Sequence, residues 1–165
     1  MNLAVIKRVP TVFLRGVVLL LGLIVLALCI FALPEAWRGG PLEFPAVGYA
    51  VQMIVIGMYL TALPFYIGLW QTLLLLNHID RNAAFSVASV RALRTIKWCA
   101  GVISAFYIAF VFPFYLIAEV DDAPGLILMS IVVACAPIAV AVFAAVLERL
   151  LQNAIEMKSE NDLTV

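Results

Sequence analysis

The sequence predicts an all-α integral membrane protein with four transmembrane helices, arranged as two hairpins, whose fourth helix protrudes into the cytoplasm. Hydrophobic residues make up 66% of the 165 residues and charged residues 12%, whereas about a quarter of a soluble domain is charged. The mean hydropathy is +1.15, and a soluble domain of this size cannot bury so much apolar surface. Four apolar runs reach the roughly 20 residues that a membrane-spanning helix needs.

The composition also excludes several classes of function. Cys29, Cys99 and Cys135 are far apart and lie inside apolar runs, and the sequence contains no CxxC pair and no Cys/His cluster. It shows no nucleophile–base pair and no phosphate-binding loop. We therefore expect no enzymatic activity, no metal, no cofactor and no direct contact with nucleic acid. The expected partners are the lipid bilayer and other proteins.

The first span covers residues 12–33, and Arg15 is the charged residue within it. A cleaved signal peptide has a shorter apolar stretch, of about 7–15 residues, followed by small residues at the cleavage site. Here Pro34 and Glu35 follow the apolar stretch. We therefore expect an uncleaved helix that ends near Leu33.

The other spans cover residues 46–76, 98–118 and 123–147, and none of them contains a charged residue. Pro64, Pro113 and Pro137 lie in the interior of these three spans, one in each, and a proline inside a helix removes one hydrogen bond and kinks it. Pro64 and Pro137 fall near the bilayer midplane. This pattern fits broken helices that line a cavity, and it equally fits the ordinary prolines of membrane helices.

Polar and small residues within the spans suggest how the helices pack. Three pairs with small residues four apart favour close approach of helices: Gly57 with Thr61, Gly101 with Ala105, and Ala141 with Ala145. The polar side chains within the spans suit hydrogen bonds between helices, which is a common use of such residues in membranes. They are Gln52, Thr61, Gln71, Thr72, Ser104 and Ser130.

The positions of lysine and arginine predict the orientation, because short cytoplasmic loops are enriched in both residues. With both termini in the cytoplasm, the external side would carry Arg38 alone. The internal side would carry Lys7, Arg8, Arg15, Arg81, Arg91, Arg94, Lys97, Arg149 and Lys158. We therefore expect a multi-pass protein of the bacterial inner membrane with cytoplasmic N- and C-termini.

A cytoplasmic loop at residues 77–97 and a tail at residues 148–165 complete the single domain. Ser86 is a good N-cap, so a helix is expected to begin at Val87 and to continue into the third span. The fourth helix should reach about Lys158, because Ser, Asn and Asp disfavour helix beyond it. The acidic tail, which includes Glu156, is then expected to lie against the basic loop.

The candidate partner-binding residues come from this loop and this tail. The loop offers a basic face that suits an acidic protein partner or anionic lipid. The tail offers acidic residues followed by an apolar one. The full set is Arg81, Arg91, Arg94, Glu160, Asn161, Asp162 and Leu163.

Two segments carry a family resemblance: Phe85-Ser86 through Arg91-x-x-Arg94-x-Ile96-Lys97, and the ending Glu160-Asn161-Asp162-Leu163-Thr164-Val165. Together they resemble the bacterial four-helix membrane family of unknown function numbered 2975. Members are often encoded beside a small helix-turn-helix regulator of the Cro/CI type. The resemblance implies a membrane partner that senses a signal and controls such a regulator. The family offers no catalytic residues to carry over.

Two functional hypotheses follow. The first is a sensory or regulatory protein that binds a soluble transcriptional regulator, or another partner, at its cytoplasmic face. The alternative is a small transporter or channel subunit, although the intramembrane acidic residue on which small multidrug exporters depend is missing here. Either hypothesis is compatible with a homo-oligomer.

Overall fold

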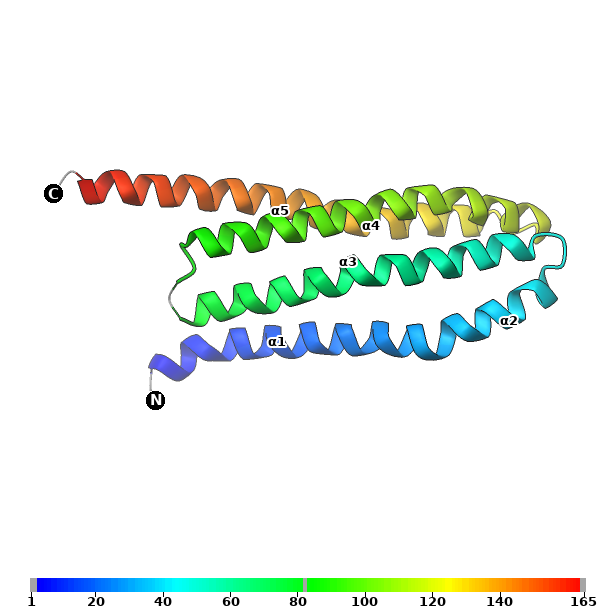
Figure 1. Ribbon diagram of the computed structural model, residues 1–165, viewed down its shortest axis with the longest axis horizontal. Helices are drawn as coiled ribbons and strands as arrows, with labels where there is room; N and C mark the ends of the chain where they lie inside the picture. The colour runs from blue at the N-terminus through cyan, green and yellow to red at the C-terminus, as the bar shows by residue number, and fades with distance from the viewer. Residues whose placement is uncertain (1–2, 82, 164–165) are drawn as a thin grey trace.

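The computed structural model describes the backbone of residues 3–81 and 83–163 and the side chains of residues 11–81 and 83–161 (Figure 1). All of its regular elements in this range are helices, and four of them are long and apolar enough to cross a membrane. This confirms the all-helical class. The elements are α1 (Leu3–Ala27), a π-helical turn η1 (Leu28–Ala32), α2 (Leu33–Glu43), α3 (Gly48–Asp80), α4 (Val87–Val120) and α5 (Gly125–Leu163).

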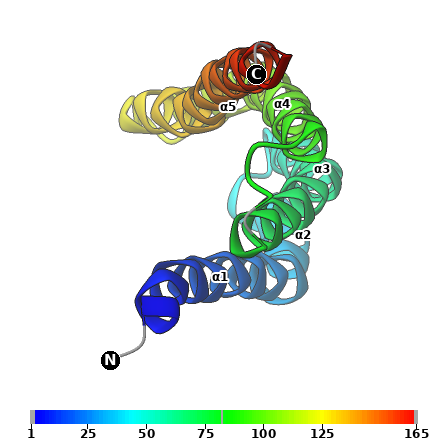
Figure 2. The ribbon, with the colours of Figure 1, turned by 90° about the vertical axis from the view of Figure 1, so that its left-hand side faces the viewer.

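The long helices form an open arc and not a closed four-helix bundle. Helix α1 packs on α3, α3 on α4 and α4 on α5, whereas α1 and α5 are not packed against each other in the described part of the chain. The end-on view shows the arc and its concave side (Figure 2). The start of α1, the turn at residues 81–86 and the end of α5 lie at one end of the molecule, which we call the basic end (Figure 1).

The first span is longer than expected, because the helix continues past Pro34 to Glu43. At η1 the Leu33 N–H donates to the Leu28 carbonyl, five residues back. The Cys29 carbonyl therefore loses its usual donor, and the next possible donor, Pro34, has no N–H. The Tyr59 hydroxyl of α3 donates to this carbonyl at 2.8 Å. The proline is thus accommodated by a π turn, and a side chain from the neighbouring helix supplies the missing bond.

The expected loop at residues 77–97 is mostly helical. Helix α3 runs to Asp80 and α4 begins at Val87, so the connection is reduced to residues 81–86. The predicted cap is confirmed, because the Ser86 hydroxyl accepts a hydrogen bond from the Ser89 N–H at 3.3 Å. The first turns of α4 bury Val90 and Leu93, and this packing stabilises a helix outside the apolar run.

Helix α5 also exceeds its expected length, because it continues to Leu163 and not to about Lys158. No glycine or proline follows Ile155 to end it. The Ser159 hydroxyl, which was expected to compete with the helix, donates to the Glu156 carbonyl at 2.8 Å within the helix. Weak residue preferences are therefore outweighed by the continuity of a long helix.

Close packing joins the two inner helices. A Cβ atom at Gly57 of α3 would overlap the ring of Phe110 on α4, so only glycine allows the ring to lie so close. Thr61, four residues on, is buried. By contrast, nothing lies within 4 Å of a Cβ atom built at Gly101. The first small-residue pair therefore serves this interface, and Gly101 serves no contact in the described chain.

The four serine and threonine side chains that were expected to link helices bond within their own helices instead. Thr72 donates to the Gly68 carbonyl and Ser104 to the Ala100 carbonyl, each four residues back in its own helix. Thr61 and Ser130 bond in the same way to carbonyls three residues back. Such local bonds are always within reach of a short hydroxyl side chain in a helix.

Candidate functional site

An ion cluster at the basic end joins α4 to α5. Glu148 of α5 accepts hydrogen bonds from Arg94 Nε at 2.8 Å and from Lys97 Nζ at 2.6 Å, both on α4. Its side chain is 7% exposed, whereas those of Arg94 and Lys97 are 54% and 32% exposed. The two cations satisfy the buried carboxylate and leave one positive charge in excess within this cluster.

A second ion pair joins α1 to α3 at the same end. Arg15 donates to Asp80 at 2.7 Å and reaches the Asn77 side-chain oxygen at 3.5 Å. The sequence placed Arg15 at the end of the first span but did not suggest its partner, which is 65 residues away. The two edge helices of the arc are therefore both held at the basic end by charges.

The structure separates the predicted partner-binding residues. Arg81 and Arg91 are exposed, whereas Arg94 is engaged with Glu148. Glu160 and Asn161 are exposed near the end of α5. The side chains of Asp162 and Leu163 lie outside the described residues.

The tail meets the basic loop through Glu148, and the predicted contact of Glu156 with that loop is not found in the described part of the chain. Helix α5 stays straight and runs beyond the other helices at the basic end (Figure 1). Glu156 forms no ion pair with Arg81 or Arg91 in the described part of the chain. Of the three loop arginines expected to hold the tail, Arg94 binds its first residue, Glu148.

The part of α5 that follows Glu148 carries two apolar faces. Leu151 and Ile155 share the face of Glu148, toward α4, and are half-buried. Leu150, Ala154 and Met157 form a second stripe, at positions i, i+4 and i+7 of the helix, which we call the α5 stripe. Leu150 is 59% exposed and Met157 is 64% exposed. The helical spacing of apolar residues in the sequence indicated an amphipathic helix here. It did not indicate which apolar face the other helices leave exposed.

A cavity on the concave side lies between Pro64 and Pro137. Its volume is about 420 Å³. All four spans contribute to its lining, through Leu21 of α1, Pro64 of α3, Tyr107 of α4 and Pro137 of α5. Both prolines therefore line one cavity, although α3 and α5 continue as unbroken helices through them. Pro113 is buried in α4 and does not line it.

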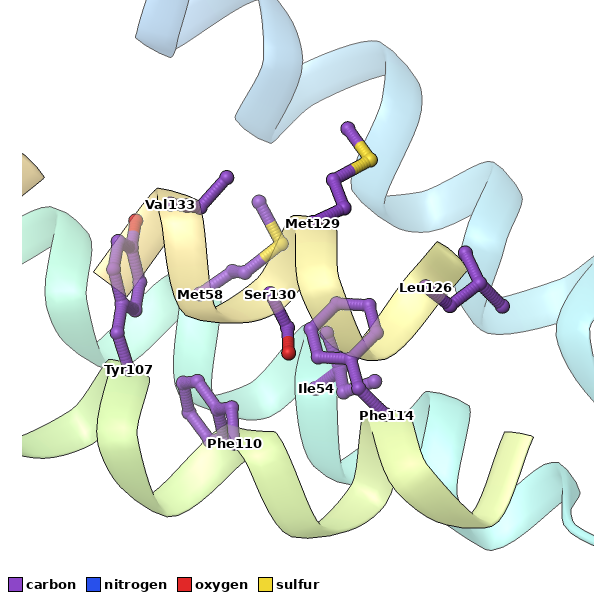
Figure 3. Close-up of a pocket in the computed structure, with 9 residues that line it drawn as sticks. All are labelled: Ile54, Met58, Tyr107, Phe110, Phe114, Leu126, Met129, Ser130 and Val133. Atoms are coloured by element: carbon purple, nitrogen blue, oxygen red, sulfur yellow. The ribbon is translucent and has the colours of Figure 1, made fainter. Parts of the chain in front are cut away.

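Two smaller cavities, each of about 160 Å³, adjoin the first at Tyr107. In one of them Met58 of α3, Phe110 of α4 and Ser130 of α5 surround the space with Tyr107 (Figure 3). We call the three cavities that share Tyr107 the central groove. The Tyr107 hydroxyl makes no hydrogen bond within the described residues, so the groove presents hydrocarbon, the thiols of Cys29 and Cys99 and one unpaired hydroxyl.

Comparison with known proteins identifies relatives but no function. The family described as "Protein of unknown function (DUF2975)" matches residues 41–165. The chain is 50% identical over 159 residues to the "Uncharacterized membrane protein YoaS" of Bacillus subtilis (strain 168), covering 96% of this chain and 99% of that protein. No solved structure shows significant similarity.

Proposed function

We propose that this chain, which belongs to the DUF2975 family of proteins of unknown function, is a regulatory or sensory membrane protein that binds a soluble protein at its cytoplasmic face. The observation that carries the proposal is the α5 stripe. It is an apolar face on a helix that extends past the rest of the molecule. The proposed role is therefore binding and not catalysis.

The proposal requires the basic end to face the cytoplasm of a bacterial inner membrane. The distribution of lysine and arginine supports this orientation. An alkaline phosphatase fused after Val165, which is active only outside the cytoplasm, should be inactive, while the same enzyme inserted at residue 45 should be active. The reverse result would overturn the orientation and the proposed binding face with it.

Depth along α5 supports a contact outside the membrane. Glu148 and its cations mark the level where charge begins, and Met157 is nine residues further along the same helix. At 1.5 Å per residue, Met157 lies about 13 Å beyond the cluster. Anchors at i, i+4 and i+7 are those with which an amphipathic helix enters the groove of a partner.

The charges beside the stripe suggest the chemistry of the partner. Exposed Arg81 and Arg91 lie at the basic end, and exposed Glu156 and Glu160 lie on α5. A partner with an apolar groove bordered by charges of both signs would suit this face. The family resemblance makes a small helix-turn-helix regulator of the Cro/CI type the specific candidate.

Site-specific crosslinking tests the stripe. A benzophenone side chain is introduced at Met157 and, as a matched control, at Ser159, which is exposed and lies on the opposite side of α5. Irradiation of intact cells should join a helix-turn-helix protein to position 157 and not to position 159. Equal products at both positions, or products that contain only lipid or the chain itself, would refute the proposal.

A second variant separates binding from folding. Met157→Glu should abolish the crosslink formed from a benzophenone at position 150, because it places a charge in the apolar contact. Ser159→Glu should leave that crosslink unchanged. Membrane levels of both variants should equal those of the wild type, because Met157 packs against little of the described chain.

A small transporter remains the second candidate, because Pro64 and Pro137 line one cavity near the middle of the spans, as the broken helices of transporters do. Vesicles containing the purified chain should then move an apolar dye against its gradient when an ion gradient is applied. Ala136→Trp, which fills the cavity, should stop that movement.

A further inference from the structure

The central groove lies where a ligand can reach it from within the bilayer. A cavity lined by both α1 and α5 must lie on the concave side of the arc, because these helices are not packed against each other in the described chain. The end-on view shows that side open between α1 and α5 (Figure 2). In a membrane, hydrocarbon therefore has lateral access to the groove.

The size of the groove favours a thin occupant. Its largest cavity of about 420 Å³ falls within the range of roughly 300–1,000 Å³ for small-molecule sites. A helix about 10 Å in diameter fills about 400 Å³ per turn and needs about six turns to cross the hydrocarbon. The cavity thus holds about one turn of helix, whereas a flexible hydrocarbon chain can follow its irregular shape.

The lining also favours hydrocarbon. Residues of the central groove are apolar except for a few hydroxyl groups. Those of Thr72 and Ser130 are already bonded to carbonyls of their own helices. An occupant with many polar groups would lose its hydrogen bonds to water and find few replacements.

Positive charge lies at one end of the groove. Pro137, Val140, Ala144 and Glu148 follow one face of α5, at spacings of three and four residues, so the ion cluster continues the line of the groove toward the basic end. Lys97 directly follows Ile96, which lines the largest cavity. The cluster has one positive charge in excess. Arg94 donates to Glu148 through Nε, so its terminal guanidinium nitrogens form no hydrogen bond in the described chain.

We propose that the central groove binds one acyl chain of an anionic phospholipid, whose phosphate lies on Arg94 and Lys97 at the basic end. The apolar lining selects the chain, and the excess positive charge selects the headgroup. This binding does not depend on the α5 stripe, so it holds or fails independently of the soluble partner.

Native mass spectrometry of the purified full chain in detergent tests the proposal. We expect phosphatidylglycerol to bind at least tenfold more tightly than phosphatidylcholine with the same acyl chains. Ala136→Trp, in the largest cavity, should weaken phosphatidylglycerol binding at least tenfold. The matched control Ala139→Trp, which is exposed on α5 and lines none of the three cavities, should change it less than twofold.

The headgroup contact is tested by replacing the whole ion cluster. The triple variant Arg94→Gln, Lys97→Gln, Glu148→Gln removes the excess charge without leaving an unpaired carboxylate. It should bind the two lipids equally. A preserved preference for phosphatidylglycerol would overturn the headgroup assignment, and equal binding by the wild type and Ala136→Trp would overturn the groove assignment.

A benzophenone at position 107 provides a readout that does not depend on a bulky substitution. Irradiation in phosphatidylglycerol vesicles should add the mass of one lipid to the chain. A crosslinked dimer would show that a second copy fills the groove. Either that dimer or the absence of a lipid adduct would overturn the proposal.

Discussion

Helices α3 and α4 have neighbours on both sides, whereas α1 and α5 each pack along one side of the arc. In the most apolar 18 residues of each span, 22% are buried in α3 and α4, against 11% in the first span and in α5. The edge helices also have the more apolar windows. This is expected of helices that present most of their surface to lipid.

The two pairs differ in their polar contacts. The inner pair is joined by close packing, with the Phe110 ring against Gly57. The edge helices are joined by directional polar contacts, from Tyr59 to the Cys29 carbonyl in η1 and from Glu148 to its two cations. Lipid supplies no hydrophobic force between helices, so a helix with one neighbour depends on such contacts to keep its register.

The largest effect is expected where α5 meets α4. Arg94→Ala with Lys97→Ala would leave Glu148, whose side chain is 7% exposed, without a partner. Removing the partners of a buried charge costs about 3–5 kcal/mol. The free energy of unfolding, measured by detergent-induced unfolding, should fall by an amount of that order. Glu148→Leu added to this double variant should recover most of the loss. A triple variant as unstable as the double would contradict the role assigned to the carboxylate.

A smaller effect is expected at the inner pair. Gly57→Ala would force Phe110 to move and should lower the free energy of unfolding by about 1–3 kcal/mol, as overpacking does. Gly101→Ala, which meets nothing within 4 Å, should change it by less than about 0.5 kcal/mol. Equal effects at the two glycines would show that close packing does not distinguish the inner pair.

A hydrogen bond to α1 should contribute less. Tyr59→Phe leaves the Cys29 carbonyl unpaired, and a loss of about 1 kcal/mol is expected for one such bond in a membrane. Pro34→Ala restores a backbone N–H near that carbonyl. In the Pro34→Ala background, Tyr59→Phe should therefore lower the free energy of unfolding by less than half as much. A double-mutant cycle measures this coupling, and a coupling of zero would contradict the explanation of the π turn.

The smallest effect is expected for Arg15 and Asp80. Their side chains are 37% and 21% exposed, and pairs this accessible contribute about 0–1 kcal/mol. A cycle of Arg15→Gln and Asp80→Asn should give a coupling within that range, which salt should reduce. A coupling above about 2 kcal/mol would show that α1 is held as firmly as α5.

The sequence was sufficient for properties that depend on composition and local order. Four uncharged or nearly uncharged runs implied four helices, because a backbone in lipid must satisfy its own hydrogen bonds. Ser86 located the start of α4 because capping is a local contact. The midplane positions of Pro64 and Pro137 pointed to the cavity that they line.

Helix lengths were less predictable, since residue preferences are weak compared with the continuity of a packed helix. Pro34 does not end the first span, because η1 and Tyr59 of another helix accommodate it. Ser159 does not end α5, because its hydroxyl bonds within the helix. Neither outcome can be read from the residues on each side of the expected end.

By itself, then, the sequence determined the membrane class, the number of spans, the cap of α4 and the excess of basic residues on one side. Tertiary structure alone decided that the helices form an open arc, that Glu148 binds Arg94 and Lys97, and that Leu150 and Met157 remain uncovered. The physical reason is that in lipid most faces of a spanning helix are apolar. Composition therefore does not say which face of a helix meets a neighbour. The contacts that decide it join residues at least 30 positions apart.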